Sequence, residues 1–145
     1  MDLEQIRAEV AKDMVFDDAT LDREALRIPQ LHGKYLNFLT DTKLTVVRCQ
    51  QKYDSLYRLK WEYYTGKMDQ SQLEALKWEP FQFKLLRTDV DMYLNTDPDL
   101  QNLQAKLEYE KAKFAFLEST LKDIMNRQWM IRCAIDFRKF ITGVS

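Results

Sequence analysis

The chain has 145 residues, and 46% of them are hydrophobic, which is sufficient for a single domain, residues 1–145, with a real core. Three glycines and three prolines leave few strand-turn signals and favour long helices. Cys49 and Cys133 have no CxxC partner, so neither a disulfide framework nor a zinc site is expected. The start is acidic and no apolar run reaches membrane-spanning length, which predicts a cytoplasmic protein without a signal peptide or a membrane contact.

Charge is segregated along the chain, although the net charge is only −1. Residues 1–26 carry three basic and eight acidic side chains, whereas residues 27–67 carry eight basic and three acidic ones. Residues 68–126 carry seven basic and eleven acidic side chains, and residues 127–145 carry four basic and one acidic side chain. Nucleic-acid binding requires a local basic patch rather than a basic protein, so the basic segment 27–67 is compatible with nucleic-acid binding. Charge blocks are also common on solvated helices.

The N-terminal half predicts one short and one very long helix. Asp2 can cap the short helix, and residues 14–16 then predict an extended connector. The second helix begins between Thr20 and Pro29; proline is tolerated in a first turn, so Pro29 marks either the start or a kink. The helical pattern then continues to Gly66, which is placed to be the C′ glycine.

The C-terminal half begins with two weaker helical signals and one strong one. Ser71 and Glu74 resemble a capping box for a short segment that ends before Pro80. Residues 81–95 are moderately apolar and predict a further helix. The Asp97-Pro98 pair, an N-cap followed by proline in the first turn, predicts the start of a long helix that runs to about residue 140.

This last helix carries an apolar stripe with seven-residue spacing. Its members are Leu100, Leu103, Leu107, Phe114, Leu117, Leu121, Ile124, Ile131 and Ile135. Together the elements predict an all-α fold in which long antiparallel helices form an elongated bundle. We expect the stripe to be an oligomerisation surface of a homo-oligomer. The alternative is the core of the bundle within one chain.

Catalytic sites are poorly represented in the sequence. His32 is the only histidine, which excludes a histidine-rich metal site and the paired Glu-x-x-His pattern of di-iron bundles. There is no glycine-rich phosphate loop, and no serine or cysteine has a plausible histidine partner. The sequence therefore predicts a protein that is not an enzyme and needs no cofactor or metal.

The segment Tyr57–Lys67 holds three cations and four aromatic rings in eleven residues. Cations bind phosphates and flat rings stack on unpaired bases, which is the combination that single-stranded nucleic acid requires. Cations at a helix C-terminus also complement its dipole, and aromatic residues there often belong to the core. At helical spacing Arg58 and Lys60 point in nearly opposite directions, whereas Lys60 and Lys67 share a face. The residues alone leave DNA binding and protein packing about equally supported.

Residues 58–67 resemble the motif of the UvsY recombination mediators of T-even-type bacteriophages. That motif reads basic, x, basic, apolar, acidic, Tyr-Tyr, Ser or Thr, Gly, basic. Similar residues also lie upstream, at Leu3-Glu4, Lys12-Asp13, Asp18-x-Thr20 and Lys34-x-Leu36-Asn37. The resemblance covers about the first 67 residues.

The resemblance implies a small all-helical protein that binds single-stranded DNA as a ring of six or seven subunits. Such a protein helps to displace the single-stranded-DNA-binding protein and loads a RecA-like recombinase, in the cytoplasm of the infected bacterial host. Arg58 and Lys60 match the two basic motif positions that bind DNA, in reversed order, and Trp61 replaces a smaller apolar residue. Lysine lacks the bidentate phosphate contact of arginine.

Our hypothesis assigns a role to each part of the chain. Residues 1–67 bind DNA, residues 68–96 form connector helices and residues 97–145 oligomerise the chain. Phosphates are expected to bind to Arg58, Lys60, Lys67 and Lys52. Bases are expected to stack on Trp61, Tyr63 or Tyr64. The alternative function is a structural coiled-coil scaffold or adaptor without DNA binding.

Overall fold

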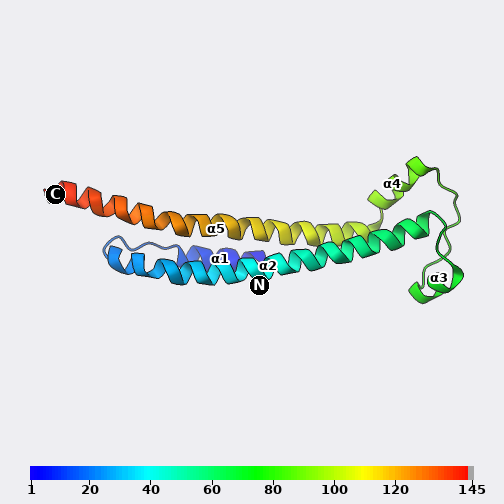
Figure 1. The fold of residues 1–145 in the computed structure, drawn as a ribbon, viewed down its shortest axis with the longest axis horizontal. Helices are drawn as coiled ribbons and strands as arrows, with labels where there is room; N and C mark the ends of the chain where they lie inside the picture. The colour runs from blue at the N-terminus through cyan, green and yellow to red at the C-terminus, as the bar shows by residue number, and fades with distance from the viewer. Residues whose placement is uncertain (144–145) are drawn as a thin grey trace. The chain divides into compact units, whose positions relative to one another are not determined.

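The computed structural model describes residues 1–143, and all regular structure in that range is helical (Figure 1). The helices are α1 (Leu3–Asp13), α2 (Leu21–Tyr64), α3 (Gln70–Leu76), α4 (Arg87–Asn95) and α5 (Pro98–Thr142). The predicted all-α fold class is therefore confirmed. Within residues 1–143, no helix combines the length and apolar character that crossing a membrane requires.

Two helices begin at the predicted caps. The Asp2 carboxylate accepts a hydrogen bond from the backbone N–H of Gln5, and the Gln5 side chain accepts one from the N–H of Asp2. At α5, the Asp97 carboxylate accepts from the N–H of Leu100 at 3.1 Å, and Pro98 occupies the first helical position. Both carboxylates satisfy N–H groups that a helix start leaves without a partner.

Gly66 ends α2 as predicted. Its φ of +71° is a left-handed conformation that costs other residues free energy because of their Cβ atom. The N–H of Lys67 donates to the carbonyl of Glu62, and the N–H of Gly66 donates to that of Tyr63. These two bonds form a Schellman motif, which satisfies the last carbonyls of the helix.

Helix α2 begins earlier than a start at Pro29 would allow. Its first residue is Leu21, so Pro29 lies inside the helix. The first turn carries Asp22 and Glu24, acidic residues that complement the positive end of the helix dipole. The interior proline is tolerated here because the helix is held by packing against α1 and α5 in this part of the chain.

Two predictions for the middle of the chain are wrong. The cap of α3 is Asp69, not Ser71, and Gln72 rather than Glu74 completes the capping box. Asp69 and Gln72 have the same three-residue spacing, two residues earlier in the chain, and they form the capping box of α3. Residues 81–86 are not helical, since α4 begins only at Arg87 after an extended N-cap residue.

The chain divides into two compact units: unit 1, residues 1–43 and 111–145, and unit 2, residues 44–110. In unit 1, α1, the first half of α2 and the later part of α5 share a core. Its buried residues are Ile6, Leu31, Tyr35, Leu117, Leu121 and Ile124. The hydroxyl of Tyr35, which is fully buried, donates to the Asp13 carboxylate at 2.8 Å. This bond satisfies a polar group that burial would otherwise make costly.

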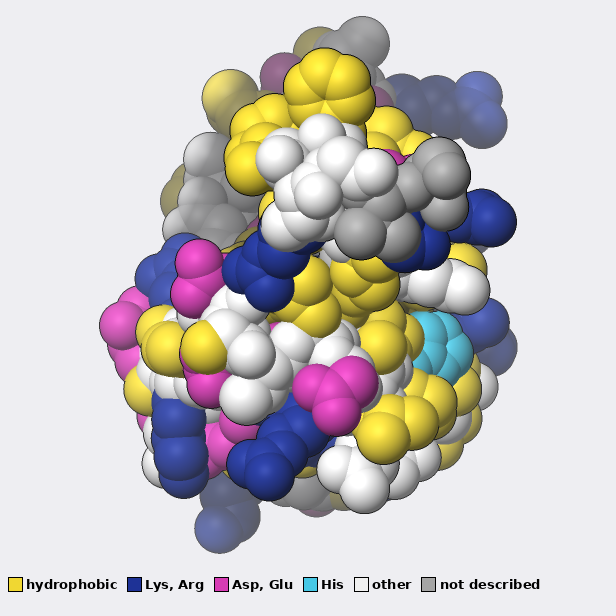
Figure 2. Space-filling model, turned by 90° about the vertical axis from the view of Figure 1, so that its left-hand side faces the viewer, with side chains coloured by type: hydrophobic (Ala, Val, Ile, Leu, Met, Phe, Trp, Pro, Cys, Tyr) yellow, Lys and Arg dark blue, Asp and Glu magenta, His cyan; other side chains and the backbone are white. Residues whose placement is uncertain are grey.

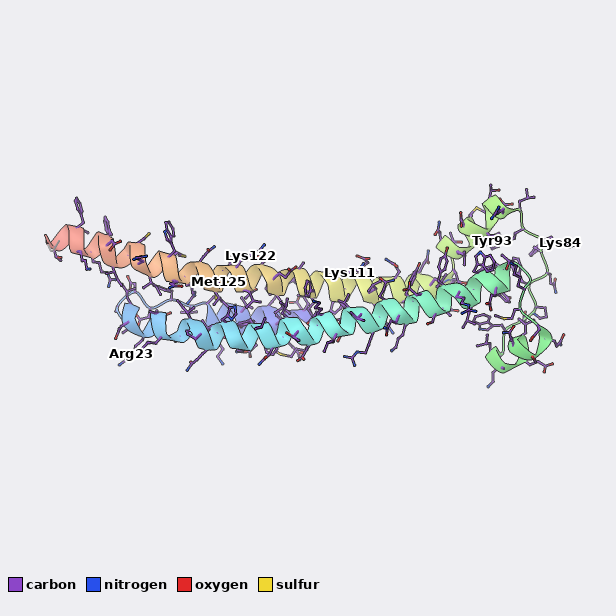
Figure 3. All side chains as sticks on the ribbon, viewed as in Figure 1. Arg23, Lys84, Tyr93, Lys111, Lys122 and Met125 are labelled. Carbon is purple, nitrogen blue, oxygen red and sulfur yellow. The ribbon has the colours of Figure 1, made fainter. Side chains whose placement is uncertain are left out.

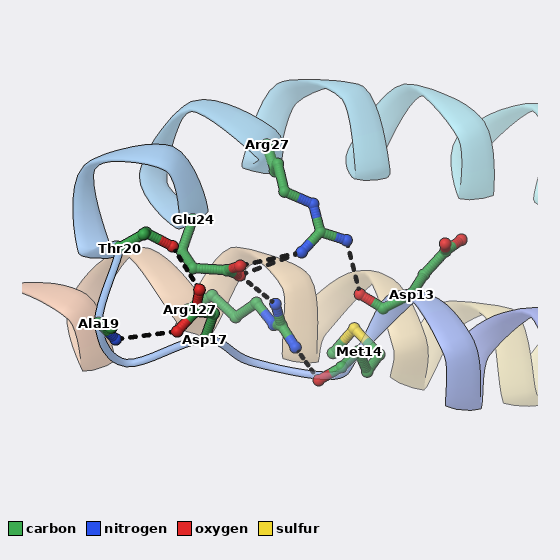
Figure 4. Close-up of polar contacts among 8 residues, drawn as sticks. All are labelled: Asp13, Met14, Asp17, Ala19, Thr20, Glu24, Arg27 and Arg127. Atoms are coloured by element: carbon green, nitrogen blue, oxygen red, sulfur yellow. Dashed lines mark hydrogen bonds and ion pairs between the residues drawn. The ribbon is translucent and has the colours of Figure 1, made fainter.

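A buried ion pair joins the start of α2 to α5 in unit 1 (Figure 4). Glu24 and Arg127 are each 5% exposed, and Arg127 Nη1 lies 3.3 Å from Glu24 Oε2. Arg127 also donates to the carbonyl of Met14, and Arg27 donates to both Glu24 and the carbonyl of Asp13. Two guanidinium groups therefore hold the connector between α1 and α2 against the helices beside it.

The predicted oligomerisation stripe lies mostly inside the chain. Six of its nine members are buried in the single chain: Leu100, Leu107, Leu117, Leu121, Ile124 and Ile131. Leu103 and Phe114 are half-buried, and only Ile135 is exposed. The alternative that the sequence left open, a core within one chain, describes the six buried residues because their side chains already have neighbours.

Other apolar residues of α5 are exposed. In the end view of Figure 2, apolar side chains gather around the last turns of α5, with cationic side chains beside them. The exposed large apolar residues of its second half include Met125, Trp129, Met130, Phe137, Phe140 and Ile141. An apolar surface of this kind on a helix end is typical of contacts with other molecules.

Candidate nucleic-acid interface

The motif at the end of α2 lies over a small apolar core in unit 2. Val90, Leu94 and Leu100 are buried there, and Tyr53, Leu56, Tyr64 and Leu85 pack against them. The core brings the end of α2 together with α4 and the start of α5. It therefore determines which motif side chains face inward and which remain on the surface.

Lys60, one of the predicted phosphate contacts, faces inward. Its residue is 7% exposed, and its ammonium lies 2.9 Å from Asp99 Oδ2 and 3.1 Å from Asp97 Oδ2. The ammonium also lies 4.5 Å from the centre of the Trp78 ring. Burial alone would lower the pKa of Lys60, but hydrogen bonds to the two aspartates raise it above its usual value. The cation is neutralised within the chain, so its placement does not match the expected phosphate contact.

Asp97 is the centre of this cluster. Its carboxylate accepts hydrogen bonds from the Tyr64 hydroxyl at 2.6 Å and from the N–H of Leu100, and it pairs with Lys60. Burial would raise the pKa of Asp97, but these three donors outweigh it and the pKa is lowered. Burial and the bond to Asp97 raise the pKa of Tyr64, which therefore stays a neutral donor. The N-cap of α5 is thus tied directly to the last turns of α2.

The two motif tyrosines belong to an aromatic cluster rather than to an open surface. The Tyr63 ring lies 5.3 Å from Trp78 and 5.6 Å from Phe81, and the Tyr64 ring lies 5.1 Å from Phe81 and 5.6 Å from Tyr93, measured between centroids. Figure 3 shows Tyr93 on α4, near the end of α2. The rings meet largely edge to face and fill one another's surfaces. Both tyrosines are half-buried in this cluster, so their rings are less accessible to a base than an exposed ring would be.

The remaining predicted residues are on the surface. The Arg58 side chain is 82% exposed, and its guanidinium lies 3.3 Å from the carboxylate of Glu62, four residues later on the same helix. Trp61 is 38% exposed, and the Lys67 ammonium lies 4.4 Å from the centre of its ring. Lys52 is exposed on the flank of α2. Arg58 and Trp61 are three residues apart and therefore share a face of the helix.

Arg58 and Lys60 point in opposite directions, as their helical spacing predicted. Arg58 points to solvent and Lys60 to the carboxylates of the α5 start. Their two charges consequently have different physical roles, although they stand two positions apart. Of these two cations, Arg58 can exchange its partner for a phosphate at small cost, because ion pairs with an exposed member contribute little free energy.

Sequence reasoning missed three surface residues next to the motif: Phe83, Lys84 and Arg87. They line a groove of about 960 Å³ together with Trp61 and Lys67. The sequence analysis expected residues 81–95 to form one helix, whereas residues 81–86 are not helical and α4 begins only at Arg87. The signal available in the sequence was Pro80 followed by alternating aromatic and polar residues, which is typical of extended chain.

A metal centre has no support in the geometry. Within residues 1–143 there is no group of three or more His, Cys, Asp or Glu side chains that could hold a metal ion. The carboxylates of Asp97 and Asp99 are instead bound to Lys60. The exposed side chains at the end of α2 are instead cations and rings, among them Arg58, Trp61 and Lys67.

Comparison with known proteins gives concordant results. Residues 9–144 match the family described as recombination, repair and ssDNA binding protein UvsY. The recombination protein uvsY of Enterobacteria phage T4 is 25% identical over 143 residues, 99% of each chain. Two crystal forms of the bacteriophage T4 recombination mediator protein UvsY are each 24% identical to the chain, with TM-scores of 0.85 and 0.87. They cover 97% and 99% of this chain and 99% of the T4 chains.

Proposed function

Because the chain belongs to the UvsY family of recombination, repair and single-stranded-DNA-binding proteins, we propose that it is a recombination mediator that binds single-stranded DNA as a homo-oligomer. The observation that carries this proposal is the exposed end of α2. There Arg58 is almost fully solvated, and Trp61 and Lys67 form an exposed ring–cation pair. Such a surface suits a flexible strand that offers both phosphates and unpaired bases.

The residues divide into two roles in this proposal. Arg58, Lys67 and Lys52 contact phosphates, and Trp61 stacks on a base. Lys60 does not contact DNA in this proposal; it positions the end of α2 against the start of α5 through Asp97 and Asp99. Tyr63 and Tyr64 support the same geometry through the aromatic cluster.

Assembly is the second part of the proposal. Exposed apolar residues on the later turns of α5, among them Trp129 and Phe140, are candidates for the contact between subunits. The resemblance to UvsY mediators favours a ring of six or seven. A ring repeats the end of α2 in every subunit, so phosphate contacts that are weak singly add up along one strand.

The proposed cellular role is the one that the resemblance to UvsY mediators implies. The DNA-bound oligomer helps to displace the single-stranded-DNA-binding protein and loads a RecA-like recombinase, without catalysing a reaction itself. Its place of action is the cytoplasm of the infected bacterial host. The distinct alternative is a coiled-coil scaffold or adaptor that does not bind DNA.

A fluorescence anisotropy titration with a labelled oligothymidylate, repeated at several salt concentrations, separates the two functions. The mediator binds the single strand more tightly than a duplex of equal length, and log affinity falls linearly with log salt because counterions are released. A scaffold shows no saturable binding at low salt. That result, obtained with protein whose helical content is intact by circular dichroism, would remove the proposed function.

A further inference from the structure

A groove in unit 2 lies beside the exposed ring–cation pair. One wall is the end of α2, with Trp61 and Lys67, and the other is the segment that joins α3 to α4, with Phe83, Lys84 and Arg87. Its volume of about 960 Å³ is within the range of roughly 300–1,000 Å³ found for small-molecule sites. Figure 3 shows Lys84 on this connecting segment.

The segment is anchored at its start and leaves its next aromatic ring exposed. Phe81 is half-buried in the aromatic cluster, with its ring 5.1 Å from that of Tyr64. Phe83 comes two residues later and is 68% exposed, although it lines the groove. Its ring lies 5.8 Å from that of Phe81. Folding gains little from an exposed phenyl ring, and this ring lines the same groove as three cationic side chains.

The charges of the groove favour an anion. Lys67, Lys84 and Arg87 are lining cations, and Asp91 is the lining acid. Among the described residues, neither Lys84 nor Arg87 has an ion pair. Arg87 is also the first residue of α4, and the N-cap residue before it offers no side-chain hydrogen bond to the helix start. The first turn of α4 adds the positive end of its dipole to the same wall, and Asp89 in that turn offsets part of it.

We propose that this groove receives an unpaired base of single-stranded DNA, with Phe83 and Trp61 as stacking surfaces and Lys84 and Arg87 as contacts to the flanking phosphates. The inference rests on the proposed function and extends it to a wall of the site that lies outside the family motif. Rings interleaved with cations are the recurring chemistry of single-strand sites, and each base has a face that can stack. An acidic peptide would use the cations but would gain nothing specific from the rings.

The rings are tested with two ligands, an oligothymidylate and an abasic strand of equal length that keeps the phosphates. Phe83→Ala should weaken oligothymidylate binding roughly tenfold and leave abasic binding unchanged, because stacking needs the base. Leu86→Ala is the matched control, since Leu86 is 72% exposed in the same segment and does not line the groove. Equal affinities for Phe83→Ala and Leu86→Ala would overturn the base site.

The cations are tested by salt dependence. Lys84→Gln combined with Arg87→Gln should lower the slope of log affinity against log salt by about 0.7 for each phosphate that is no longer neutralised. The control is Lys12→Gln with Arg23→Gln, which removes the same charge from exposed positions in unit 1. A slope equal to that of the control would overturn the phosphate contacts.

Photo-crosslinking with 5-iodouracil in the oligonucleotide locates the base directly. Crosslinks to Phe83 or Trp61 are the expected result, and crosslinks confined to other segments would contradict the inference. The outcomes also separate the two proposals. If the unaltered protein does not bind single strands, the proposed function fails; if it binds and the groove variants match their controls, only the groove assignment fails.

Discussion

Replacement of Lys60 by methionine tests whether this motif residue supports the fold or binds DNA. The substitution removes the ammonium and keeps an unbranched side chain of similar length. It leaves Asp97, which is 2% exposed, without its cationic partner, while the Tyr64 hydroxyl and the Leu100 N–H remain as donors. It also removes the pair with Asp99 and the contact with the Trp78 ring.

The magnitude follows from these three contacts. Removing one partner of a buried ion pair costs about 3–5 kcal/mol, and the two remaining donors of Asp97 place this site near the lower end. The Asp99 carboxylate is 60% exposed, so that pair adds at most about 0.5 kcal/mol. The cation–ring contact adds about 0.5–1 kcal/mol. Lys60→Met should therefore lower the free energy of unfolding by about 3.5–4.5 kcal/mol, a fall in Tm on the order of 10 °C.

Arg58→Gln is the matched counterpart, because it removes the neighbouring motif cation from an exposed position. Its effect on unfolding free energy should stay within about 0.5 kcal/mol. Urea denaturation followed by circular dichroism gives both stabilities, and anisotropy gives DNA affinity at a temperature where both variants are folded. Arg58→Gln should lose affinity and keep stability, whereas Lys60→Met should lose stability. Unchanged stability of Lys60→Met together with a lowered salt slope would refute the structural role of Lys60.

Three further predictions concern other parts of the chain. The pKa of Asp97 is lowered in the folded chain, so its stabilisation is fully present above the unfolded pKa, near 4, and is lost as pH falls below that value. Asp97→Asn should therefore be less stable at pH 7 and should lose less stability in acid, as measured by urea denaturation at several pH values. Gly66→Ala should lower the unfolding free energy by about 1–2 kcal/mol, because a φ of +71° is unfavourable for alanine even where the added Cβ meets no atom within 4 Å. A thermal melt equal to that of the unaltered protein would contradict this backbone strain. Phe140→Asp should lower the mass measured by light scattering, and an unchanged mass would place the subunit contact elsewhere.

Local signals explain why several helix ends were predictable from the sequence. The Asp97-Pro98 pair and Gly66 act on atoms within a few residues, so their effects do not depend on the rest of the fold. Pro29 left the start of α2 open between residues 20 and 29, because a proline is tolerated in a first turn and also inside a helix that tertiary packing holds, and packing is not visible locally. Residues 81–86 were misassigned because their moderate apolar content does not distinguish a helix from an extended segment anchored by one ring.

Long-range partners explain what could not be predicted about the site. Lys60 and Arg58 are chemically similar, and only the carboxylates of Asp97 and Asp99, nearly forty residues later, distinguish them. Helical spacing indicated that the two cations face opposite ways but not which one faces inward. The apolar stripe of α5 was likewise recognisable as a buried face, but its spacing could not tell a neighbour in the same chain from one in another subunit.

The central claim is that the exposed cations at the end of α2 bind the phosphates of single-stranded DNA. The most direct measurement is the salt dependence of oligothymidylate affinity for Arg58→Gln combined with Lys67→Gln, compared with Lys12→Gln combined with Arg23→Gln. The account predicts a weaker affinity and a slope reduced by about 0.7 for each phosphate that is no longer neutralised, for the first variant alone. Equal affinities and equal slopes for the two variants would contradict it.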